Sequence, residues 1–344
     1  GVGQRFSGAT WFPPPMALGS IAEQDLDLAQ QYAKQMGEVI AQEALAVGLN
    51  WILAPIADVN NNPDNPVINV RAFGETPAIV GRLVREFIAG TQQFPVLTSA
   101  KPVPGHGDTS TDSHLHLPVI PHPIDRLETL ELLPFQQAIA QGVDSVMTAH
   151  ILVPAWDDSN PATLSPAILT GQLREKLGFE GIIVTDALIM GGITDIASPG
   201  EVAVRALEAG VDILLMPPDP VPVITAIATA VESGRLTEER IEQSLQRVLT
   251  AKEKLAPAPD PSNFTINLQT GPGRKLVDQI LTTALETGGV LPIVNLGDRQ
   301  GKYLSVVDDL LTADFIDRAC PALTWPVRGG YEAQILTADL LEHY

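Results

Sequence analysis

The segment GIIVTDALIM, residues 181–190, joins a short apolar run to an aspartate that follows it directly. Its first part, residues 182–185, has the length and the β-branched composition of a buried strand. Similar runs occupy residues 51–56, 96–100, 145–148 and 213–216. Because short and almost wholly apolar runs are typical of parallel strands with both faces covered, these segments predict a parallel sheet.

Segments with the apolar spacing of helices separate these runs. They cover residues 23–47, 77–92, 126–141, 166–177, 201–209, 220–232 and 237–255. Such alternation of strands and helices indicates an α/β fold. Polar side chains follow the runs at Asp58, Lys101, His150, Asp186 and Asp219. A TIM-type (β/α)8 barrel and a doubly wound sheet both gather such groups at the carboxyl ends of their strands, so this pattern alone leaves both open.

The number of predicted strands is smaller than the eight of a closed barrel. Either the first strands lie upstream of Gly1 or the sheet is open. After the last helix, prolines at alternate positions within residues 256–262 cannot continue a helix and predict a linker. We therefore expect a barrel domain that lacks its first strands over residues 1–255, and part of a smaller α/β domain over residues 263–344. The second domain should start with a helix over 273–287 and a strand over 290–295.

Composition restricts the partners of the chain. Its 344 residues are 45% hydrophobic and include 21 basic and 41 acidic residues, which gives a formal net charge of −20. An acidic surface repels phosphate backbones and anionic lipids, so we expect neither nucleic acid nor a membrane as partner. Cys320 is the only cysteine, which excludes an internal disulfide framework and is compatible with a reducing, cytoplasmic location. The composition indicates no particular oligomeric state.

Histidines concentrate around one loop, KPVPGHGDTSTDSHLHLP, residues 101–118, where glycine and proline are frequent. Asp112 stands two residues before His114, so its carboxylate can bond one ring nitrogen. Such a bond fixes the tautomer and raises the basicity of the other nitrogen, which is typical of a general acid/base. The alternative is a surface turn in which Asp112 bonds its own backbone.

Asp186 stands directly behind an apolar strand, where an ionised carboxylate is costly unless it is paired or functional. It can act as a nucleophile that forms a covalent glycosyl intermediate, or simply cap the following helix. The guanidinium of Arg71 can hold sugar hydroxyls or make a structural ion pair. Lys101, at a strand end, can donate to a substrate or simply be an exposed lysine. His150, also at a strand end, can line the substrate pocket or simply cap the strand.

A metal site is a further hypothesis, because His114 and His116 form an HxH pair. Zinc hydrolases built on barrels use such pairs together with ligands from other strands, for which His150 and Asp186 are candidates. However, the pair lies in the middle of a loop, and Asp112 alone accounts for the orientation of His114. We therefore expect neither a metal ion nor another cofactor.

Taken together, these motifs are more specific than any one of them. The loop contributes KxxPGHGDT from Lys101, DSH at 112–114 and LP at 117–118, while MTAH at 147–150, LGFxGIIVTD at 177–186 and GVDILLM at 210–216 follow it. APIAD at 54–58 and VRAFG at 70–74 precede the loop. This ordered set, which covers about residues 1–255, strongly resembles glycoside hydrolase family 3 in its β-N-acetylhexosaminidase (β-N-acetylglucosaminidase) branch.

The resemblance implies a TIM-type barrel and a retaining, exo-acting hydrolase. Its substrates would be N-acetylglucosaminides, or other N-acetylhexosaminides, derived from cell walls as in peptidoglycan recycling. The resemblance further implies Asp186 as nucleophile, His114 as acid/base and Asp112 as the residue that orients it. The substrate-binding residues would be Arg71, Lys101, His150 and Met190. A β-glucosidase of the same family stays open as an alternative. A glycoside phosphorylase also stays open, because a histidine acid adds no negative charge that would repel phosphate.

Two departures from the family pattern affect sugar binding. The family usually has Lys-His-Phe where this chain has residues 101–103, and Pro102 cannot supply the imidazole that contacts the sugar. The family also carries an Asp-x-Glu-Gly-Gly segment, whose aspartate binds the non-reducing sugar, just before the position of residues 4–6. We expect weakened sugar binding, and the second hypothesis is a catalytically impaired sugar-binding relative.

Overall fold

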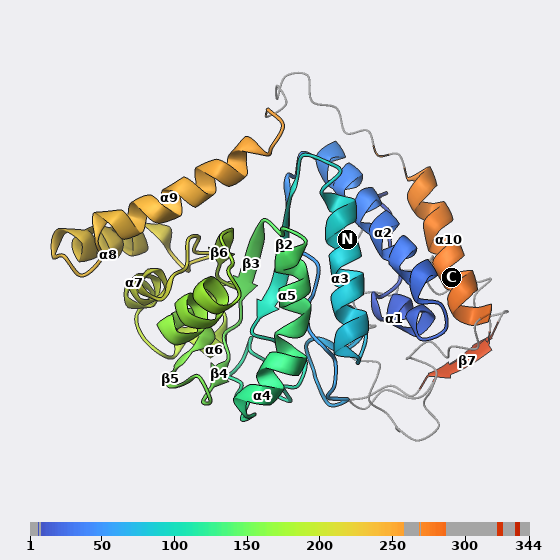
Figure 1. Cartoon of the computed structure of the whole chain (residues 1–344), viewed down its shortest axis with the longest axis horizontal. Helices are drawn as coiled ribbons and strands as arrows, with labels where there is room; N and C mark the ends of the chain where they lie inside the picture. The colour runs from blue at the N-terminus through green and yellow to red at the C-terminus, as the bar shows by residue number, and fades with distance from the viewer. Residues whose placement is uncertain are drawn as a thin grey trace.

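A parallel sheet lies at the centre of the computed structural model, which describes residues 6, 8–257, 268, 270–286, 322–325 and 334–337. Its four strands follow the order β1 (Trp51–Ile52), β2 (Leu97–Val103), β3 (Ser145–Thr148) and β6 (Ile182–Val184). The helices α3 (Pro77–Thr91) and α5 (Leu133–Ala140) lie side by side along β2 (Figure 1). Neighbouring strands follow chain order without the reversal of a doubly wound sheet. The fold is therefore α/β of the TIM type, as predicted, and the described strands form an open sheet.

Residues 213–216 do not form the additional strand that we predicted. Ile213 makes an isolated parallel bridge to Val184, so the segment does lie beside β6. Pairing stops there because Met216 has a φ of 47°, outside the range of extended backbone. The prolines that follow offer no N–H groups to continue a ladder.

The first predicted strand is also shorter than residues 51–56. Only β1 pairs continuously with β2, and Ile56 makes a separate bridge to Lys101. Pro55 lies between the two pairings and cannot donate a ladder hydrogen bond. The bridge at Ile56 nevertheless brings the segment that follows β1 next to Lys101.

Four of the helices that the periodicity predicts begin at side-chain caps, which satisfy free N–H groups of a first turn. They are α2 (Leu26–Ala46), α7 (Pro199–Ala209), α8 (Pro220–Glu232) and α9 (Glu238–Glu253), capped by Asp25, Ser198, Asp219 and Thr237. A separate helix, α1 (Met16–Ala22), precedes α2. The predicted segment that starts at residue 23 therefore begins its helix only after the Asp25 cap.

Two of the predicted helical segments are helical but contain π-helix. Residues 126–141 divide into the turn α4 (Ile124–Arg126), the π-helix η3 (Leu127–Glu131) and α5, and residues 166–177 form the π-helix η5 (Ala167–Lys176). In η3 the N–H of Leu132 donates to the carbonyl of Leu127, five residues back, at 2.9 Å. π-Turns are frequent at functional sites, and apolar periodicity does not distinguish them from α-helix.

Short elements between the main helices and strands were not predicted. They are the antiparallel hairpin β4 (Leu152–Val153) and β5 (Asp157–Pro161), the 3-10 turns η2 (Asn69–Arg71) and η4 (Ala162–Leu164), and α6 (Gly191–Thr194). Several of them lie beside the predicted active-site residues. Elements this short carry no periodic pattern of their own.

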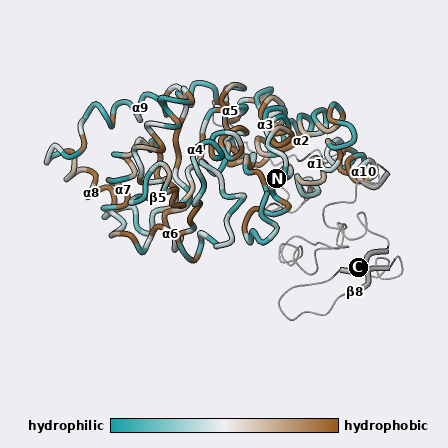
Figure 2. Tube along the Cα trace, turned by 60° about the horizontal axis from the view of Figure 1, so that its bottom comes forward, coloured by the Kyte–Doolittle hydropathy of each residue, from teal (hydrophilic) through white to brown (hydrophobic). Residues whose placement is uncertain are grey.

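The predicted helix over 273–287 is confirmed as α10 (Gly271–Glu286). Its buried face, which includes Leu276, Ile280 and Ala284, shares one apolar core with α1 and α2 (Figures 1 and 2). Farther along, β7 (Ala322–Trp325) pairs antiparallel with β8 (Gln334–Thr337). The predicted strand over 290–295 lies outside the described residues, and the domain division at residues 256–262 stays a prediction.

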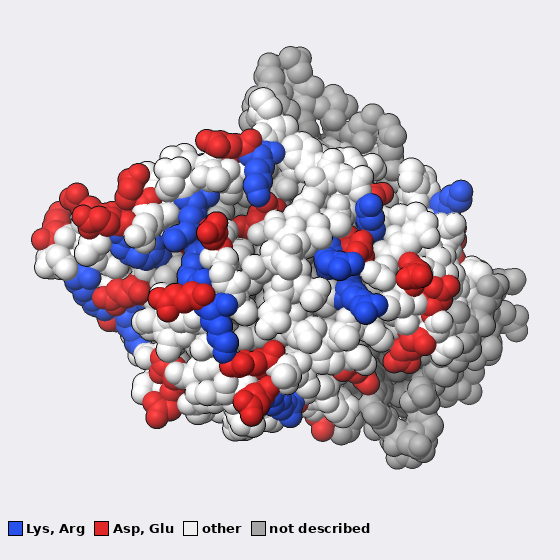
Figure 3. Space-filling view, in the orientation of Figure 1, with Lys and Arg blue, Asp and Glu red and all other residues white. Residues whose placement is uncertain are grey.

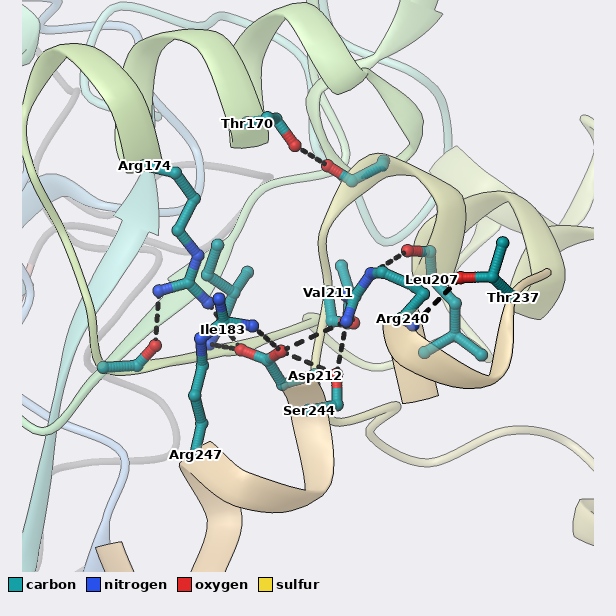
Figure 4. Close-up of polar contacts among 12 residues, drawn as sticks. Thr170, Arg174, Ile183, Leu207, Val211, Asp212, Thr237, Arg240, Ser244 and Arg247 are labelled. Atoms are coloured by element: carbon teal, nitrogen blue, oxygen red, sulfur yellow. Dashed lines mark hydrogen bonds and ion pairs between the residues drawn. The ribbon is translucent and has the colours of Figure 1, made fainter. Parts of the chain in front are cut away.

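A buried carboxylate, Asp212, ties three elements together (Figure 4). It accepts hydrogen bonds from Arg174 Nη2 at 2.6 Å, Ile183 N at 2.9 Å, Ser244 Oγ at 2.7 Å and Arg247 Nη1 at 3.0 Å, and Arg240 Nη1 lies 3.7 Å away. The side chain of Asp212 is 0% exposed. These partners lie on η5, β6 and α9. The Asp212 carboxylate therefore links strand β6 to the two helices η5 and α9.

The surface mixes charges of both signs. On the face shown in Figure 3, basic side chains near α7, α8 and α9 are interleaved with acidic ones, and a broad uncharged area crosses the middle. Within the described ranges, the structure holds no helix of the length and apolarity that a bilayer span requires.

Candidate active site

The carboxyl ends of β1, β2, β3 and β6 bring the predicted site residues to one edge of the sheet. The backbone of Ala57 donates to the carbonyl of Lys101 at 2.7 Å, and that of Ala149 donates to Val103 at 2.8 Å. Consequently the segments that carry Asp58, Lys101 and His150 lie side by side. Parallel strands present their following residues at one edge, which is where α/β enzymes place their sites.

Asp186 follows β6 at this edge and is half-buried. Its Oδ1 accepts a hydrogen bond from the N–H of Ala187 at 2.8 Å. Burial lowers the pKa of both Arg71 and Lys101, and the negative charge of Asp186 acts in the opposite direction on each of them. Asp186 thus lies near two half-buried cations, at a position that suits a nucleophile.

Asp58 lies near the same two cations, although the sequence did not identify it as a substrate-binding residue. Its Oδ1 accepts the N–H of His106 at 2.6 Å. Complete burial raises the pKa of Asp58 to about 8, against the opposing effects of that N–H, Arg71 and Lys101. Asp58 follows β1 as Asp186 follows β6, and this repeated position was the signal that could have identified it.

The predicted pairing of Asp112 with His114 is confirmed. His114 Nδ1 lies 2.7 Å from Asp112 Oδ1, which also accepts the backbone N–H of His114 at 2.8 Å. Burial would raise the pKa of Asp112, but these hydrogen bonds outweigh it and hold that pKa below its usual value. Because an ionised carboxylate only accepts, Nδ1 carries the proton and Nε2 is left for proton transfer. The His114 side chain is 60% exposed, so Nε2 can reach a bound substrate.

The His114 loop is held against the segment that follows Asp186. The N–H groups of Gly191 and Gly192 donate to the carbonyls of His114 and Ser113 at 2.9 and 3.0 Å. A Cβ on Gly191 would lie 2.6 Å from the carbonyl oxygen of Leu115, and one on Gly192 would lie 2.9 Å from that of Ser113. Only glycine allows this approach without moving the backbone. We call this pair of bonds the glycine latch.

His106 supports the same loop from below. Its Nε2 lies 2.8 Å from the hydroxyl of Ser113, and its Nδ1 contacts the hydroxyl of Thr109. Burial lowers the pKa of His106, which favours the neutral ring. Both nitrogens are therefore used inside the loop, and His106 positions the neighbours of His114 rather than facing the substrate.

The remaining predicted substrate-binding residues lie near the site but differ in exposure. His150 is buried, and its Nε2 donates to the carbonyl of Ala187 at 3.2 Å while Nδ1 lies 2.8 Å from the hydroxyl of Thr163. Burial lowers its pKa, as expected for a neutral ring that supports the backbone behind Asp186. Met190 is buried at the start of α6. Arg71 is half-buried on η2, where its Nη1 donates to the carbonyl of Val67 at 3.0 Å.

The HxH pair does not gather further ligands. His116 is exposed, and Asp112 occupies one ring nitrogen of His114. Among the described residues, the ligand atoms that do approach one another closely belong to Asp108, His122 and Glu131 instead. The site edge itself offers a carboxylate, an exposed imidazole with an oriented proton, and two half-buried cations, which is the chemistry of acid/base-assisted displacement.

Comparison with known proteins agrees with this geometry. Residues 1–251 match the family described as "Glycosyl hydrolase family 3 N terminal domain". The chain belongs to glycosyl hydrolase family 3. A family 3 β-N-acetylglucosaminidase from Paenibacillus sp. str. FPU-7 superposes with a TM-score of 0.74 at 42% identity, covering 81% of this chain and 53% of that structure.

Other similar proteins differ in their described activity. Beta-hexosaminidase A of Pseudoalteromonas piscicida is 36% identical over 83% of this family 3 chain and 51% of its own length. Beta-glucoside phosphorylase BglX is 30% identical with a TM-score of 0.73, covering 79% of this chain and 51% of that structure. The chain thus spans about half the length of these relatives. Its family and fold are those that the motifs predicted.

Proposed function

We propose that this chain is the catalytic part of a retaining β-N-acetylhexosaminidase that releases β-linked N-acetylglucosamine from non-reducing ends. Membership in family 3 and the descriptions of the relatives from Pseudoalteromonas piscicida and Paenibacillus support the reaction class. The observation that carries the proposal is the 2.7 Å contact of Asp112 with His114, on a loop latched to the segment behind Asp186. That arrangement supplies a nucleophile and an oriented acid/base at one edge.

In the first step, an Asp186 oxygen attacks the anomeric carbon while the bond from that carbon to the leaving oxygen breaks. His114, protonated on both nitrogens, gives its Nε2 proton to the leaving oxygen and becomes neutral. Asp112 keeps the Nδ1 proton in place and stabilises the imidazolium before transfer. The product of this step is a glycosyl ester of Asp186.

In the second step, water attacks the same carbon from the face that the leaving group vacated. His114 Nε2 accepts a proton from the water, and the ester bond to Asp186 breaks. Two displacements at one carbon restore the β configuration, so the enzyme retains stereochemistry. His114 returns to its protonated form, ready for the next turnover.

Arg71 and Lys101 are the groups that we propose for holding sugar hydroxyls. Both are half-buried beside Asp186, so hydrogen bonds from them to a sugar form in a partly dehydrated site, where they are stronger than in water. Burial raises the pKa of Asp58 to about 8, so at neutral pH this carboxyl is mostly protonated and leaves the positive charge of the pair largely intact. His150 and Met190 line the shell around the nucleophile rather than its open face.

The proposal is tested with 4-nitrophenyl glycosides. We expect faster release from the β-N-acetylglucosaminide than from the β-glucoside, with the β anomer of the free sugar formed first as seen by proton NMR. Formation of the α anomer first, or a preference for the glucoside, would contradict the proposal. Adding phosphate should leave the product unchanged, whereas appearance of a sugar 1-phosphate would identify a phosphorylase.

A second test addresses the glycine latch. Gly191→Ala places a methyl group against the carbonyls of Leu115 and His114, so His114 should lose its alignment. Because a misplacement of about 1 Å can cost roughly 100-fold in rate, we expect turnover of alkyl glycosides to fall by about that factor. Dinitrophenyl glycosides, whose leaving group needs little acid assistance, should lose less in the first step.

Gly171→Ala is the matched control, since its added Cβ meets no atom closer than 3.9 Å. It should leave kinetics unchanged. The rates of the first step are measured as pre-steady-state bursts. If Gly191→Ala lowered these rates equally for alkyl and dinitrophenyl glycosides, the glycine latch would not act by aligning His114 as the acid.

A phosphorylase or a β-glucosidase is the alternative within the family, supported by the likeness to beta-glucoside phosphorylase BglX. An impaired sugar-binding relative is supported by Pro102, which is buried next to Lys101 and whose side chain offers no polar group. Calorimetric binding of N-acetylglucosamine without turnover would favour this reading. A cell-wall origin of the substrate and a cytoplasmic location stay predictions, the second resting on the single cysteine.

A further inference from the structure

A second cluster of polar side chains lies outside the proposed active site. Asp108 belongs to the loop that carries His114, His122 follows that loop, and Glu131 ends the π-helix η3. Their ligand atoms, one from each residue, all lie within 4.8 Å of one another. His122 Nε2 directly contacts Asp108 Oδ2. None of these groups takes part in the reaction derived above.

Glu131 is the unusual member of this cluster. Its side chain is 4% exposed, and neither carboxylate oxygen has a hydrogen-bond partner in the part of the chain that the structure describes. Burial raises the pKa of Glu131, while the nearby charges of Arg126 and His122 act in the opposite direction. A buried carboxylate without hydrogen bonds is costly, and it needs an explanation other than packing.

The backbone around Glu131 is specialised for its inward position. The five-residue spacing of η3 rotates Glu131 relative to an α-helical continuation, and Gly105, with a φ of 136°, packs against it. A Cβ on Gly105 would lie 3.3 Å from the Cβ of Glu131. The loop and the π-helix therefore meet closely at this carboxylate.

Arg126 is the competing cation. Its Nη2 lies 3.0 Å from Asp108 Oδ2, and its Nε lies 3.5 Å from Glu131 Oε1 without a hydrogen bond. The Arg126 side chain is 33% exposed. The guanidinium can therefore move outward when an ion binds and contact only the carboxylate oxygen that the ion leaves free. It neutralises the cluster in part but does not satisfy Glu131.

We propose that Asp108, His122 and Glu131 bind a divalent transition-metal ion, with Zn²⁺ the best match. One imidazole nitrogen and two carboxylate oxygens are a donor set that zinc accepts, whereas Mg²⁺ and Ca²⁺ prefer oxygen alone. The side chains of Asp108 and His122 are partly exposed, which leaves an entry path and a position for water. The ion would join the start of the His114 loop to η3.

The role that follows is structural. Asp108 lies four positions before Asp112 on one loop, so fixing Asp108 to Glu131 shortens the free part of the loop that carries the acid/base pair. Fewer free residues mean a smaller conformational entropy to lose when His114 is aligned. The glycine latch fixes the far part of the loop, and the ion would fix its beginning.

The test uses the full chain without an affinity tag, freed of metal by a chelator and dialysed. We expect calorimetric titration with ZnCl₂ to show one site, and CoCl₂ to give the visible absorption of a protein-bound ion. Glu131→Gln and His122→Gln should each weaken binding by at least tenfold, which is the lower range even for residues that only support metal ligands. This readout needs no turnover, so it stands apart from the proposed hydrolase function.

Two variants separate the site from its alternatives. Arg126→Gln removes the competing cation, so it should bind Zn²⁺ at least as tightly as the unaltered chain. His116→Gln tests the HxH pair and should leave the affinity unchanged. Absence of a single site in the unaltered chain, or loss of binding in His116→Gln but not in Glu131→Gln, would overturn the proposal. Circular dichroism checks that each variant is folded. If Glu131→Gln does not fold, the Zn²⁺ affinity of His122→Gln tests the site instead.

Discussion

Asp186→Ala is expected to lower turnover by roughly 10⁴-fold or more, because Asp186 is the group that we propose to form the glycosyl ester. The alanine leaves room on that face of the sugar for a small anion. Added azide should therefore attack the anomeric carbon from the vacated side in a single displacement and give the α-glycosyl azide. The measurement is initial rate with an activated β-N-acetylglucosaminide, with product configuration read by NMR.

His114→Ala gives the complementary result. Its nucleophile is intact, so the glycosyl ester still forms from an activated substrate, and azide then attacks from the opposite face to give the β-glycosyl azide. Asp195→Ala, an exposed aspartate just after α6, is the matched control and should keep full activity. If Asp186→Ala and His114→Ala gave azides of the same configuration, the assignment of roles would be wrong.

Asp212→Asn is expected to lower the free energy of unfolding by about 3–5 kcal/mol, the range observed when one partner of a buried ion pair is removed. Arg174, Arg240 and Arg247 would lose their shared anion, and asparagine can accept fewer hydrogen bonds than the carboxylate. The loss should appear as a lower urea midpoint in chemical denaturation. The unfolding slope should stay the same, since the buried area does not change.

The exposed ion pairs of Arg235 with Glu201 and Glu208 provide the control. Glu208→Gln removes a contact of similar distance at the surface, where such pairs contribute about 0–1 kcal/mol. A loss of less than about 1 kcal/mol in Asp212→Asn would show that the arginines find solvent or other partners. The cluster would then not be what holds α9 to the sheet.

The sequence predicts those parts of the fold that a periodic pattern determines. The strands around residues 97–100, 145–148 and 182–184 are confirmed because each is a short apolar run with both faces covered. The run at 213–216 has the same composition but is not a strand. The positive φ of Met216 ends the extended backbone there, and a hydropathy pattern gives no information about φ.

The same division holds in the site. The contact of Asp112 with His114 is predictable because the two residues lie close together in the sequence and the bond is local. The burial of Asp58 depends on three segments that meet only in the folded chain. The inward position of Glu131 depends on a π-turn, whose sequence resembles that of an ordinary helix. Long-range placement and helix type were the parts that the sequence did not determine.

The glycine latch has a consequence for how this active site can diversify. Both bonds run from backbone to backbone, so the identity of the side chains at Leu115 and His116 does not enter them. These side chains are exposed and lie beside His114. Mutations there can alter which leaving groups are accommodated while the alignment of His114 is inherited unchanged. Two glycines in another segment thus hold part of the loop backbone in place, and the exposed side chains of residues 115 and 116 can change without breaking these two bonds.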